Sequence, residues 1–520
     1  MSVSASGFLE LFHQKCSETP DACFAIWGEK KVTFRDLDRA SKAIAVDAQS
    51  RGLRPGDRVA VMMRNRPEVL AILFGIARAG LVWVPINPEQ RGQGLRYLIE
   101  HSEPKAIFLD GERYSALTTC GAELGHCSII THDPEKSSAL DDIWDRDEAF
   151  ADIEVSSDEL FSIMYTSGTT GRPKGVLVTH GMVRFAGEAA IMLADAKDDS
   201  VLFMWEPLYH IGGAQVLVMP LLRTLHIVMT DRFSASRFWQ QVKAAGATHI
   251  HYLGGILQML MRQPPTDEER ATKARIGWGA GATAKNWIAI QDRFGIRLRE
   301  AYGMTETSSI ATFNGDGTPG SVGRAVPWFD VSVVDESGQT VPNGVRGEIV
   351  VTPLRPNCLF AGYYKNEEAS SAALRGGKMY TGDLGSIDSE GRLNFHGRMT
   401  DSVRCRGENV SALEVEEVVR LHPSVADCAV IGVDADIGEQ EIKLIVQPKP
   451  DVAIDPAQLS NWLSSRLAPY QNPRYISFVD GFQRTPSERV MKHTLTRDLS
   501  DSWDRLMKKS SGDLLGAGLQ

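Results

Sequence analysis

Amphipathic helices alternate with short apolar strands over the first hundred residues, and this alternation constrains the fold more than any other feature of the chain. Residues 33–52 and 67–80 follow helical periodicity, and each run ends at a glycine. Residues 58–65 and 81–88 are apolar, β-rich runs of strand length. Helices that alternate with buried strands indicate an α/β fold built on a parallel sheet.

The chain is too long for one hydrophobic core. It has 520 residues, so two or more domains are expected. From residue 321 to 395 the pattern changes to β runs joined by Gly, Pro and Asn turns, which predicts a β-rich subdomain. A compact α+β domain is expected over residues 399–510, and a disordered tail over 511–520. The predicted organisation is a large N-terminal domain, 1–398, with mixed and parallel sheets, followed by this small and mobile C-terminal domain.

The small domain begins with a charged helical segment. Residues 412–423 read ALEVEEVVRLHP and predict a helix. We expect Glu414, Glu416 and Glu417 to lie on its exposed side. Two apolar strands and a second helix follow in the sequence, which fits a separate α+β unit.

Composition excludes several classes of function. The formal net charge is −10 and no basic stripe is present, which argues against nucleic-acid binding. Seven scattered cysteines without a CxxC pair predict neither a disulfide framework nor a zinc site, and they fit a reducing cytoplasm. The N-terminus lacks a signal-peptide pattern, and the most apolar stretch, residues 69–86, is interrupted by Arg78. We therefore expect a cytoplasmic protein without a membrane span.

A loop rich in glycine and hydroxyl groups is the clearest chemical signal. The stretch Tyr165–Val176 reads YTSGTTGRPKGV, and an apolar strand runs into it. Exposed backbone N–H groups, hydroxyls and an ammonium suit a polyphosphate. The spacing is not that of a P-loop, because Gly175 rather than Ser or Thr follows Lys174. Since residues 180–193 read as a helix, two modes of anion binding stay open: a helix start, or a nest of backbone amides.

Seven motifs occur in one order along nearly the whole chain. They are YTSGTTGRPKG (165–175), PLYHIGG (207–213), AYGMTET (301–307), GYYKN (362–366), YTGDLG (380–385), GRMTDSVRCRGENVSALEVE (397–416) and RTPSERVMK (484–492). On these motifs the chain resembles the adenylate-forming (ANL) superfamily of acyl-CoA synthetases, peptide-synthetase adenylation domains and luciferases. The stretch RGENVSALEVE, together with the tail, is most similar to acyl-CoA ligases of the crotonobetaine/carnitine-CoA ligase type.

The resemblance implies two half-reactions in one cleft. A carboxylate attacks the α-phosphate of ATP, with Mg²⁺ present, to give acyl-AMP and pyrophosphate. The small domain then rotates, and the thiol of coenzyme A attacks the acyl carbon and releases AMP. The implied partners are thus ATP, coenzyme A and a small-molecule carboxylic acid. Dimers are common in the superfamily, so a homodimer is an expected assembly.

The resemblance also assigns residues to the nucleotide. The residues implied to cradle the β- and γ-phosphates are Thr166, Ser167, Gly168, Thr169, Thr170, Gly171 and Lys174. Those implied to contact adenosine are Gly279, Ala280, Gly281, Tyr302, Gly303 and Met304, together with Asp383 and Arg398 at the ribose. Thr305 is implied to hydrogen-bond the α-phosphate, and Glu306 to bind Mg²⁺. Each residue also has a plain structural reading, as part of a surface loop, a strand end or a turn.

A second set of residues is implied to handle the thiol substrate. His210 is implied to gate the pantetheine tunnel beside the reacting carboxylate. Gly407 is implied to admit the pantetheine arm, because it has no side chain. Arg404 and Arg406 flank this glycine and are placed to meet the phosphates of coenzyme A or, equally, to be solvated arginines.

The expected acyl pocket is apolar. It should draw on residues 251–258 and Trp278, and no Asp or Lys stands there to pair with a charged substrate. Trp205 and Trp278 further suggest a bulky, hydrophobic acid. Aromatic residues are, however, more often part of a core than of a pocket.

The chain departs from the superfamily pattern at two places. The hinge residue, usually Asp or Lys, falls on Thr400 with Asp401 next to it, and either residue can pivot. In the final motif Glu488 replaces the usual glycine. Arg489 replaces the usual lysine, which bridges the carboxylate and the α-phosphate during adenylation and leaves the site when the domain rotates. Arginine is a wide planar fork where lysine is a point charge on a slim stem, and a misplacement of about 1 Å can cost on the order of a hundredfold in rate. Lys492 lies a helical turn away.

Two interpretations of Arg489 follow. In the first, Arg489 impairs adenylation but leaves the transfer of a preformed acyl-AMP to coenzyme A intact, so that a separate adenylating enzyme of a natural-product pathway supplies the acyl-adenylate. In the second, arginine substitutes adequately and the protein is a complete two-step acyl-CoA synthetase. A stand-alone adenylation enzyme that loads a carrier protein is the nearest rival, although it usually has a pocket Asp that this chain lacks at the expected place. A luciferase-like oxygenase or a non-enzymatic nucleotide sensor fits less well.

Overall fold

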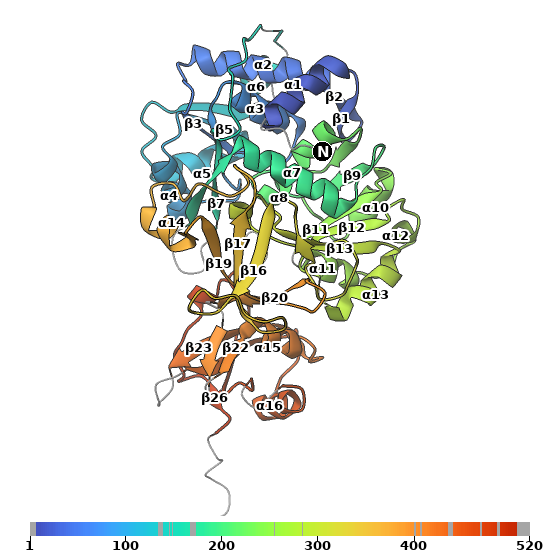
Figure 1. Cartoon of the computed structure of the whole chain (residues 1–520), viewed down its shortest axis with the longest axis vertical. Helices are drawn as coiled ribbons and strands as arrows, with labels where there is room; N and C mark the ends of the chain where they lie inside the picture. The colour runs from blue at the N-terminus through green and yellow to red at the C-terminus, as the bar shows by residue number, and fades with distance from the viewer. Residues whose placement is uncertain are drawn as a thin grey trace, which may run out of the picture.

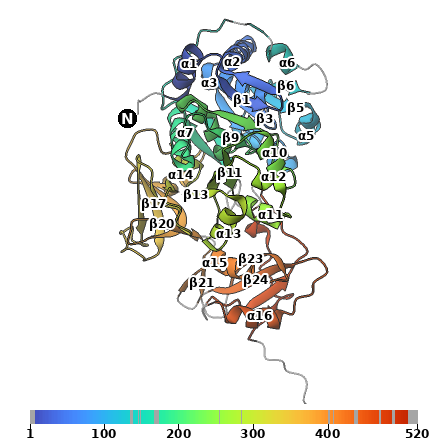
Figure 2. The same cartoon turned by 90° about the vertical axis from the view of Figure 1, so that its right-hand side faces the viewer.

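A large body and a smaller domain beneath it make up the molecule, as both views show (Figures 1 and 2). The computed structural model describes residues 7–133, 139–144, 146–147, 149–166, 173–253, 255–282, 284–399, 402–405, 408–434, 440–467, 471–485 and 489–506. Within the body, two sheets pack around helices, and an antiparallel sheet lies to one side of them (Figure 2).

A six-stranded sheet contains the strands of the helix–strand alternation. In sheet order its strands are β6 (Ser128–His132), β5 (Ala106–Asp110), β3 (Arg58–Met62), β4 (Val82–Pro85), β7 (Leu160–Thr166) and β8 (Lys174–Thr179). All neighbours in this sheet are parallel except β7 and β8. The parallel sheet expected from the alternation is confirmed, because helical crossovers connect β3, β4 and β5.

A nine-stranded sheet carries the ends of several motifs. In sheet order its strands are β15 (Arg324–Ala325), β14 (Thr312–Asn314), β13 (Arg297–Tyr302), β12 (Ile276–Ala280), β11 (His249–Leu253), β9 (Val201–Met204), β10 (His226–Met229), β1 (Cys23–Trp27) and β2 (Lys30–Thr33). The strands from β13 to β1 are parallel, and antiparallel pairs close both edges. Because the carboxyl ends of parallel strands meet at one edge, Tyr302 at the end of β13 lies beside the loop that follows β12.

Helices cover both sheets and lie between them. The α-helices of the body are α1 (Phe8–Glu18), α2 (Phe34–Ser50), α3 (Pro67–Arg78), α4 (Gly92–Ser102), α5 (Tyr114–Thr119), α6 (Ala139–Trp144), α7 (His180–Ala194), α8 (Ile211–Ala214), α9 (Met219–Leu222), α10 (Phe238–Ala244), α11 (Ile256–Arg262), α12 (Asp267–Arg270), α13 (Ala284–Phe294) and α14 (Glu367–Ala373). Among the described residues, the 3₁₀ helices are η1 (Gly111–Arg113), η2 (Gln215–Val218) and η3 (Thr305–Thr307) in the body, and η5 (Lys492–Thr494) in the small domain. Helix α7 is buried along most of its length and contacts β8 as well as β12 and β13, so it lies between the two sheets. In the described part of the chain, no helix combines the length and the apolar character that crossing a bilayer requires.

Local sequence signals set where these helices begin. The Thr33 side chain accepts a hydrogen bond from the backbone N–H of Asp36, and the Asp36 carboxylate accepts one from the N–H of Thr33, which forms a capping box at the start of α2. Helix α3 begins at Pro67, where the missing N–H has no helical partner to lose. Thr179 accepts from the N–H of Met182 and caps α7.

The antiparallel sheet and the small domain occupy the second half of the chain. The strands of this sheet are β16 (Phe329–Val334), β17 (Gly347–Pro353), β18 (Leu374–Arg375), β19 (Lys378–Ile387) and β20 (Leu393–Arg398). The small domain contains the hairpin β21 (Ser402–Cys405) and β22 (Glu408–Ser411), the sheet β23 (Val425–Asp434), β24 (Gln440–Pro448), β25 (Tyr475–Phe478) and β26 (Trp503–Asp504), and helices α15 (Ala412–Val419) and α16 (Pro456–Ser464). A large α/β domain followed by a small α+β domain is the fold class expected from the sequence. The predicted tail, 511–520, lies outside the described residues.

One expectation about the glycine-rich loop is wrong. Strand β8 follows the loop directly and pairs antiparallel with β7, so the loop joins two strands of a hairpin. Helix α7 begins only at His180, after β8. A helix start therefore does not lie at the loop, because the run KGVLVT is a strand. The alternative, a nest of backbone amides, falls on residues 167–172, which are outside the described residues.

Arg78 interrupts the most apolar stretch of the sequence because it closes a buried ionic cluster. It lies at the end of α3 with its side chain almost fully buried. Its guanidinium pairs with Asp38 on α2 and, at 3.0 Å, with Asp152, and it lies 5.4 Å from the centre of the Phe12 ring. The cluster therefore joins α1, α2, α3 and the segment around Asp152.

Replacing this arginine should destabilise the body. The variant Arg78→Met keeps an apolar stem over Phe12 but leaves both carboxylates without their buried cation. We expect the free energy of unfolding to fall by about 2 kcal/mol and no more, because the carboxylates stay partly hydrated. The measurement is urea unfolding followed by tryptophan fluorescence. Lys42→Met removes the half-exposed cation that lies 2.8 Å from Asp38 and should cost no more than about 1 kcal/mol. Equal effects of the two substitutions would contradict this account of Arg78.

Candidate active site at the domain boundary

Asp383 is a buried carboxylate with two fixed partners. It lies on β19 opposite Arg398 on β20, and the Arg398 Nε atom is 2.8 Å from Asp383 Oδ1. The hydroxyl of Tyr302 donates to Asp383 Oδ2 at 2.8 Å. The carboxylate is only 2% exposed; burial raises its pKa, and the charge of Arg398 opposes that rise. The structure thus brings together three predicted nucleotide residues, from β13, β19 and β20.

Tyr302 ends β13, and its ring packs against strand β20 of the antiparallel sheet. The ring lies 5.6 Å, centre to centre, from that of Phe395 on β20, and burial raises the pKa of the phenol. The next residue, Gly303, has no room for a side chain, because a Cβ there would lie 2.2 Å from the carbonyl oxygen of Ser309. The glycine after Tyr302 is therefore required by a close approach of two backbone segments.

The loop after β12 is held from behind by a carboxylate that the sequence analysis missed. Gly279 has φ 154° and Gly281 has φ 107°, values that favour glycine, and a Cβ on Gly279 would lie 1.8 Å from the Tyr252 carbonyl oxygen. Glu300 on β13 accepts hydrogen bonds from the backbone N–H of Gly281 and, at 3.1 Å, from that of Ala282. The Tyr252 hydroxyl donates to the same carboxylate at 2.7 Å. Burial raises the pKa of Glu300 to about 7.

Glu306 and Lys174 lie on either side of one tyrosine. The Tyr363 hydroxyl donates to Glu306 Oε1 at 2.8 Å, and the Lys174 ammonium lies 5.0 Å from the centre of the Tyr363 ring. Among the described residues no group of three or more His, Cys, Asp or Glu side chains could hold a metal by itself. A single buried carboxylate is nevertheless suited to Mg²⁺, which is usually held by one or two carboxylates together with substrate phosphates.

The loop before His210 is fixed by a buried asparagine. The Asn65 amide donates to the Glu206 carbonyl oxygen at 2.6 Å and accepts from the backbone N–H of Leu208 at 3.0 Å. Gly213 allows the turn into α8, because a Cβ there would lie 2.2 Å from the Pro207 carbonyl oxygen. Burial, with a smaller contribution from the charge of Arg489, lowers the pKa of His210 to about 4. His210 is therefore a neutral imidazole at neutral pH.

Behind this loop lies a second feature that the sequence did not indicate. Glu206 and His251, both buried, form a close hydrogen bond between Glu206 Oε1 and His251 Nδ1. The indole N–H of Trp205 donates to the His251 carbonyl oxygen at 2.9 Å, and the Trp278 ring lies 4.2 Å, centre to centre, from the His251 ring. Both tryptophans pack in the interior, so they give the expectation of a bulky acid no independent support.

Arg489 belongs to the small domain, and its charge acts on groups of the large domain. Its charge acts on both His210 and Asp383, lowering the pKa of the imidazole and opposing the burial-driven rise at the carboxylate. Lys492, three residues later, instead pairs with Glu416 Oε1 at 2.7 Å. The expectation that Glu416 lies on the exposed side of its helix is wrong: it is 4% exposed, because Lys492 and the backbone N–H of Val430 both reach its carboxylate.

Several predicted site residues fall outside the described residues. These are Ser167, Gly168, Thr169, Thr170, Gly171, Arg406 and Gly407, together with Thr400, Asp401 and Glu488. Thr166 ends β7 and Lys174 begins β8, so these two residues stand at the two ends of the predicted phosphate loop. Arg404 lies in β21, paired in register with Asn409. Met304 and Thr305 lie at the start of η3, directly before Glu306.

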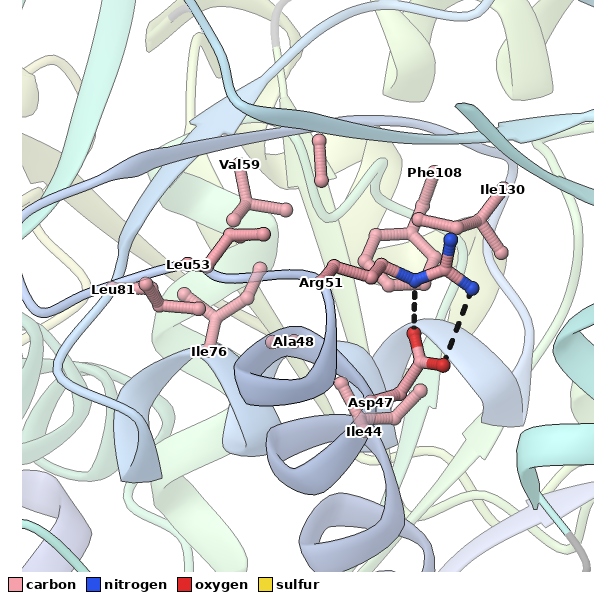
Figure 3. A pocket seen from close by; sticks show the side chains of 11 residues that line it. Ile44, Asp47, Ala48, Arg51, Leu53, Val59, Ile76, Leu81, Phe108 and Ile130 are labelled. Carbon is pink, nitrogen blue, oxygen red and sulfur yellow. Dashed lines mark hydrogen bonds and ion pairs between the residues drawn. The ribbon is translucent and has the colours of Figure 1, made fainter. Parts of the chain in front are cut away.

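A small apolar cavity lies away from these residues. It is lined by side chains of α2, α3 and the six-stranded sheet, including Ile44, Ile76 and Phe108, with the Arg51–Asp47 ion pair beside it (Figure 3). Its volume is about 10 Å³, close to the least that one water needs. It cannot hold a substrate, and the apolar lining marks it as a packing defect of the core.

Comparison with known protein families identifies the family to which the chain belongs. A model described as "AMP-binding enzyme" matches residues 12–364, and one described as "AMP-binding enzyme C-terminal domain" matches residues 414–489. The chain belongs to the AMP-binding enzyme family. The match to the second model ends at Arg489.

Relatives of this AMP-binding enzyme are similar over almost its full length. The crotonobetaine/carnitine–CoA ligase of Salmonella paratyphi B is 29% identical over 485 residues, which are 90% of this chain and 93% of the relative. The structure of ATP-bound MatB from Rhodopseudomonas palustris superposes with a TM-score of 0.85 at 29% identity, covering 93% of this chain and 97% of MatB. The AMP complex of O-succinylbenzoate coenzyme A synthetase (MenE) from Bacillus subtilis gives a TM-score of 0.80 at 25% identity, covering 93% of this chain and 97% of MenE. The resemblance to the adenylate-forming superfamily is confirmed.

Glu300 should make the stability of this AMP-binding enzyme depend on pH. The folded pKa of about 7 lies above the ordinary value of 4.5, so the stabilising contribution is complete below about pH 4.5 and is lost as pH rises through 7. The loss amounts to about 3 kcal/mol at 1.36 kcal/mol per unit. Glu300→Gln does not titrate. We therefore expect the wild type to lose about 2–3 kcal/mol relative to this variant between about pH 5 and about pH 8, measured by urea unfolding. A constant difference between the two proteins would contradict the shifted pKa.

Proposed function

We propose that this AMP-binding enzyme is an AMP-forming acid–thiol ligase, which converts a carboxylic acid to its coenzyme A thioester through an acyl-adenylate. The observation that carries the proposal is the convergence on Asp383 of Tyr302, Arg398 and the charge of Arg489, which come from three separate parts of the chain. Similarity to a CoA ligase and to ATP- and AMP-bound proteins of the same fold supports it.

In this proposal the buried boundary holds the ribose and adenine of the nucleotide. Asp383 has two acceptor oxygens, which match the vicinal hydroxyls of a ribose, and Arg398 favours its ionised form. Tyr302 offers a flat apolar face to adenine while its hydroxyl orients Asp383. Gly279, Ala280 and Gly281 provide backbone without bulky side chains for close approach of the base.

The phosphates of ATP are proposed to lie between the β7–β8 loop and η3. Lys174 and Glu306 have opposite charges and are joined through Tyr363, so the site can bind both phosphate oxygens and a cation. Thr166 and Thr305 offer hydroxyls at the edges of this region. Mg²⁺ would be held by Glu306 and would offset charge on the departing pyrophosphate.

The second half-reaction is proposed to use His210 as a neutral group. An imidazole with a pKa of about 4 can accept or donate a hydrogen bond at neutral pH without adding charge beside the acyl carbon. Gly407, with Arg404 and Arg406, stays the proposed passage for the pantetheine arm and its phosphates. The acid is proposed to be hydrophobic, because Ile211, Gly212, Gly213 and Ala214 follow His210 in α8 without a charged side chain.

The adenylation half-reaction is proposed to be slow because of Arg489. The superfamily places a lysine here, whose compact ammonium contacts two oxygens at once, whereas a guanidinium is wider and differently directed. Lys492 does not supply the missing group in this structure, since its ammonium is bound to Glu416. A preformed acyl-adenylate from a separate adenylating enzyme would bypass the slow step, and transfer to coenzyme A would proceed.

Restoring the lysine should change one half-reaction selectively. We expect Arg489→Lys to raise ATP–pyrophosphate exchange by about tenfold or more with an accepted acid, because the ammonium regains the reach of the usual residue. Thioester formation from synthetic acyl-AMP and coenzyme A should stay within about twofold, followed by mass spectrometry. The matched control is Arg497→Lys, at an exposed position of the same domain.

The competing functions give different results in the same assays. Robust exchange in the wild type that Arg489→Lys leaves unchanged would identify a complete two-step synthetase and contradict the proposed impairment. Acyl transfer to a carrier protein, with none to coenzyme A, would identify a stand-alone adenylation enzyme. A panel of aliphatic, aromatic and charged acids, offered also as their adenylates, tests the proposed hydrophobic preference.

A further inference from the structure

Arg489 stands on a short hairpin of the small domain. Arg484 and Val490 form an antiparallel bridge, and the backbone N–H of Met491 donates to the Gln483 carbonyl oxygen at 2.8 Å. Nearer the tip, the N–H of Thr485 donates to the Arg489 carbonyl oxygen at 2.8 Å, and the N–H of Arg489 donates to the Thr485 hydroxyl at 3.1 Å. We call residues 483–485 and 489–492 the Arg489 hairpin. The orientation of its base therefore sets where Arg489 points.

Each leg of the Arg489 hairpin contains a cation that pairs with another element of the small domain. Arg484, on the incoming leg, pairs closely with Asp427 of β23. Lys492, at the end of the outgoing leg, pairs with Glu416 of α15 at 2.7 Å. Arg420 joins the two carboxylates, with its Nε 2.9 Å from Asp427 Oδ1 and its Nη2 3.4 Å from Glu416 Oε2. We call these five residues the ionic clamp.

The two carboxylates of the ionic clamp are themselves held by backbone groups. The N–H of Val430 donates to Glu416 Oε1 at 2.8 Å, and the N–H of Cys428 donates to Asp427 Oδ1 at 2.8 Å. Burial works to raise the pKa of Asp427, but Arg484 and Arg420 together bring it below its ordinary value, so the carboxylate is ionised at neutral pH. Fixed, partly buried anions in a network hold their cations more firmly than an isolated surface pair does.

We propose that Glu416, Asp427 and Arg420 are positioning residues for the adenylation half-reaction, which act through the Arg489 hairpin. The proposal rests on the proposed function, in which the group at position 489 serves adenylation. The four ion pairs of the clamp all join residues of the small domain, so the clamp moves with that domain.

The test removes one charge of the clamp while keeping the shape of its side chain. Glu416→Gln still accepts from the N–H of Val430 but no longer attracts Lys492 or Arg420. Asp504→Asn is the matched control, because Asp504 of β26 pairs with Arg474 at 3.2 Å and also accepts from a backbone N–H, that of Leu506. Both substitutions are made in the wild type and in Arg489→Lys.

We expect Glu416→Gln to lower ATP–pyrophosphate exchange by about tenfold, in the Arg489→Lys protein above all, because the reacting group is no longer fixed. Thioester formation from synthetic acyl-AMP should stay within about twofold, and Asp504→Asn should leave both rates unchanged. Unchanged exchange with Glu416→Gln, an equal loss in both half-reactions, or the same selective loss with Asp504→Asn overturns the proposal. If Arg489→Lys fails to raise exchange, the proposed impairment fails by itself, and the clamp is then judged by exchange in the wild type.

Trypsin cleavage after Arg489 gives a readout that needs no substrate. Glu416→Gln and Asp504→Asn leave every arginine and lysine in place, so the same cleavage sites are compared by intact mass. A hairpin released from the clamp should be cut at least about threefold faster in Glu416→Gln than in the wild type, whereas Asp504→Asn should match the wild type at this site. If no acid tried supports exchange, this comparison decides, and equal cleavage rates in all three proteins overturn the proposal.

Discussion

The carboxylate of Asp383 connects segments that are far apart in the sequence. Tyr302 at the end of β13 and Arg398 on β20 each come within 2.8 Å of one of its oxygens. A carboxylate that is almost fully buried stays ionised only where positive charge and hydrogen-bond donors meet it. The contacts of Asp383 therefore require the observed register of β19 with β20. They also require the antiparallel sheet to pack against the nine-stranded sheet. The fold and the proposed ribose site depend on the same contacts.

Around this centre, the chain positions its functional groups through buried polar side chains that need not touch a substrate. Glu300 holds the N–H groups of Gly281 and Ala282, and Asn65 holds the loop that leads to His210. Glu416 has the corresponding place in the small domain, where it holds Lys492. In each case a buried acceptor or donor fixes a flexible segment, which preorganises the site at the cost of burying a polar group. In the proposed scheme, the pairs of Arg484 and Lys492 fix the base of the Arg489 hairpin in the same way.

The sequence predicted the features that depend on local patterns. Helices α2, α3 and α7 and strands β3 and β4 follow from periodicity, apolar runs and glycine stops. The motif order predicted the fold and placed Asp383 and Tyr302 in one site. Strand β8 was missed because its apolar run is short and its pairing with β7 depends on the loop between them. Glu416 was misplaced because helical periodicity gives the face of a residue but not the cation, here Lys492, that arrives from a distant segment. Asn65 and Glu300 gave no signal in the sequence, since each acts on backbone groups of another element, and such pairings appear only once the chain is folded.

The ribose contact of Asp383 can be measured directly by comparing nucleotides that differ only in their hydroxyl groups. If the carboxylate accepts both ribose hydroxyls, the wild type should bind AMP at least about tenfold more tightly than 2′,3′-dideoxy-AMP by isothermal titration, because two charge-assisted hydrogen bonds are lost. In Asp383→Ala the two nucleotides should bind with similar, weak affinity. Equal affinities of the wild type for AMP and for the dideoxy nucleotide would contradict the placing of the ribose at Asp383, and with it the nucleotide site described for this boundary.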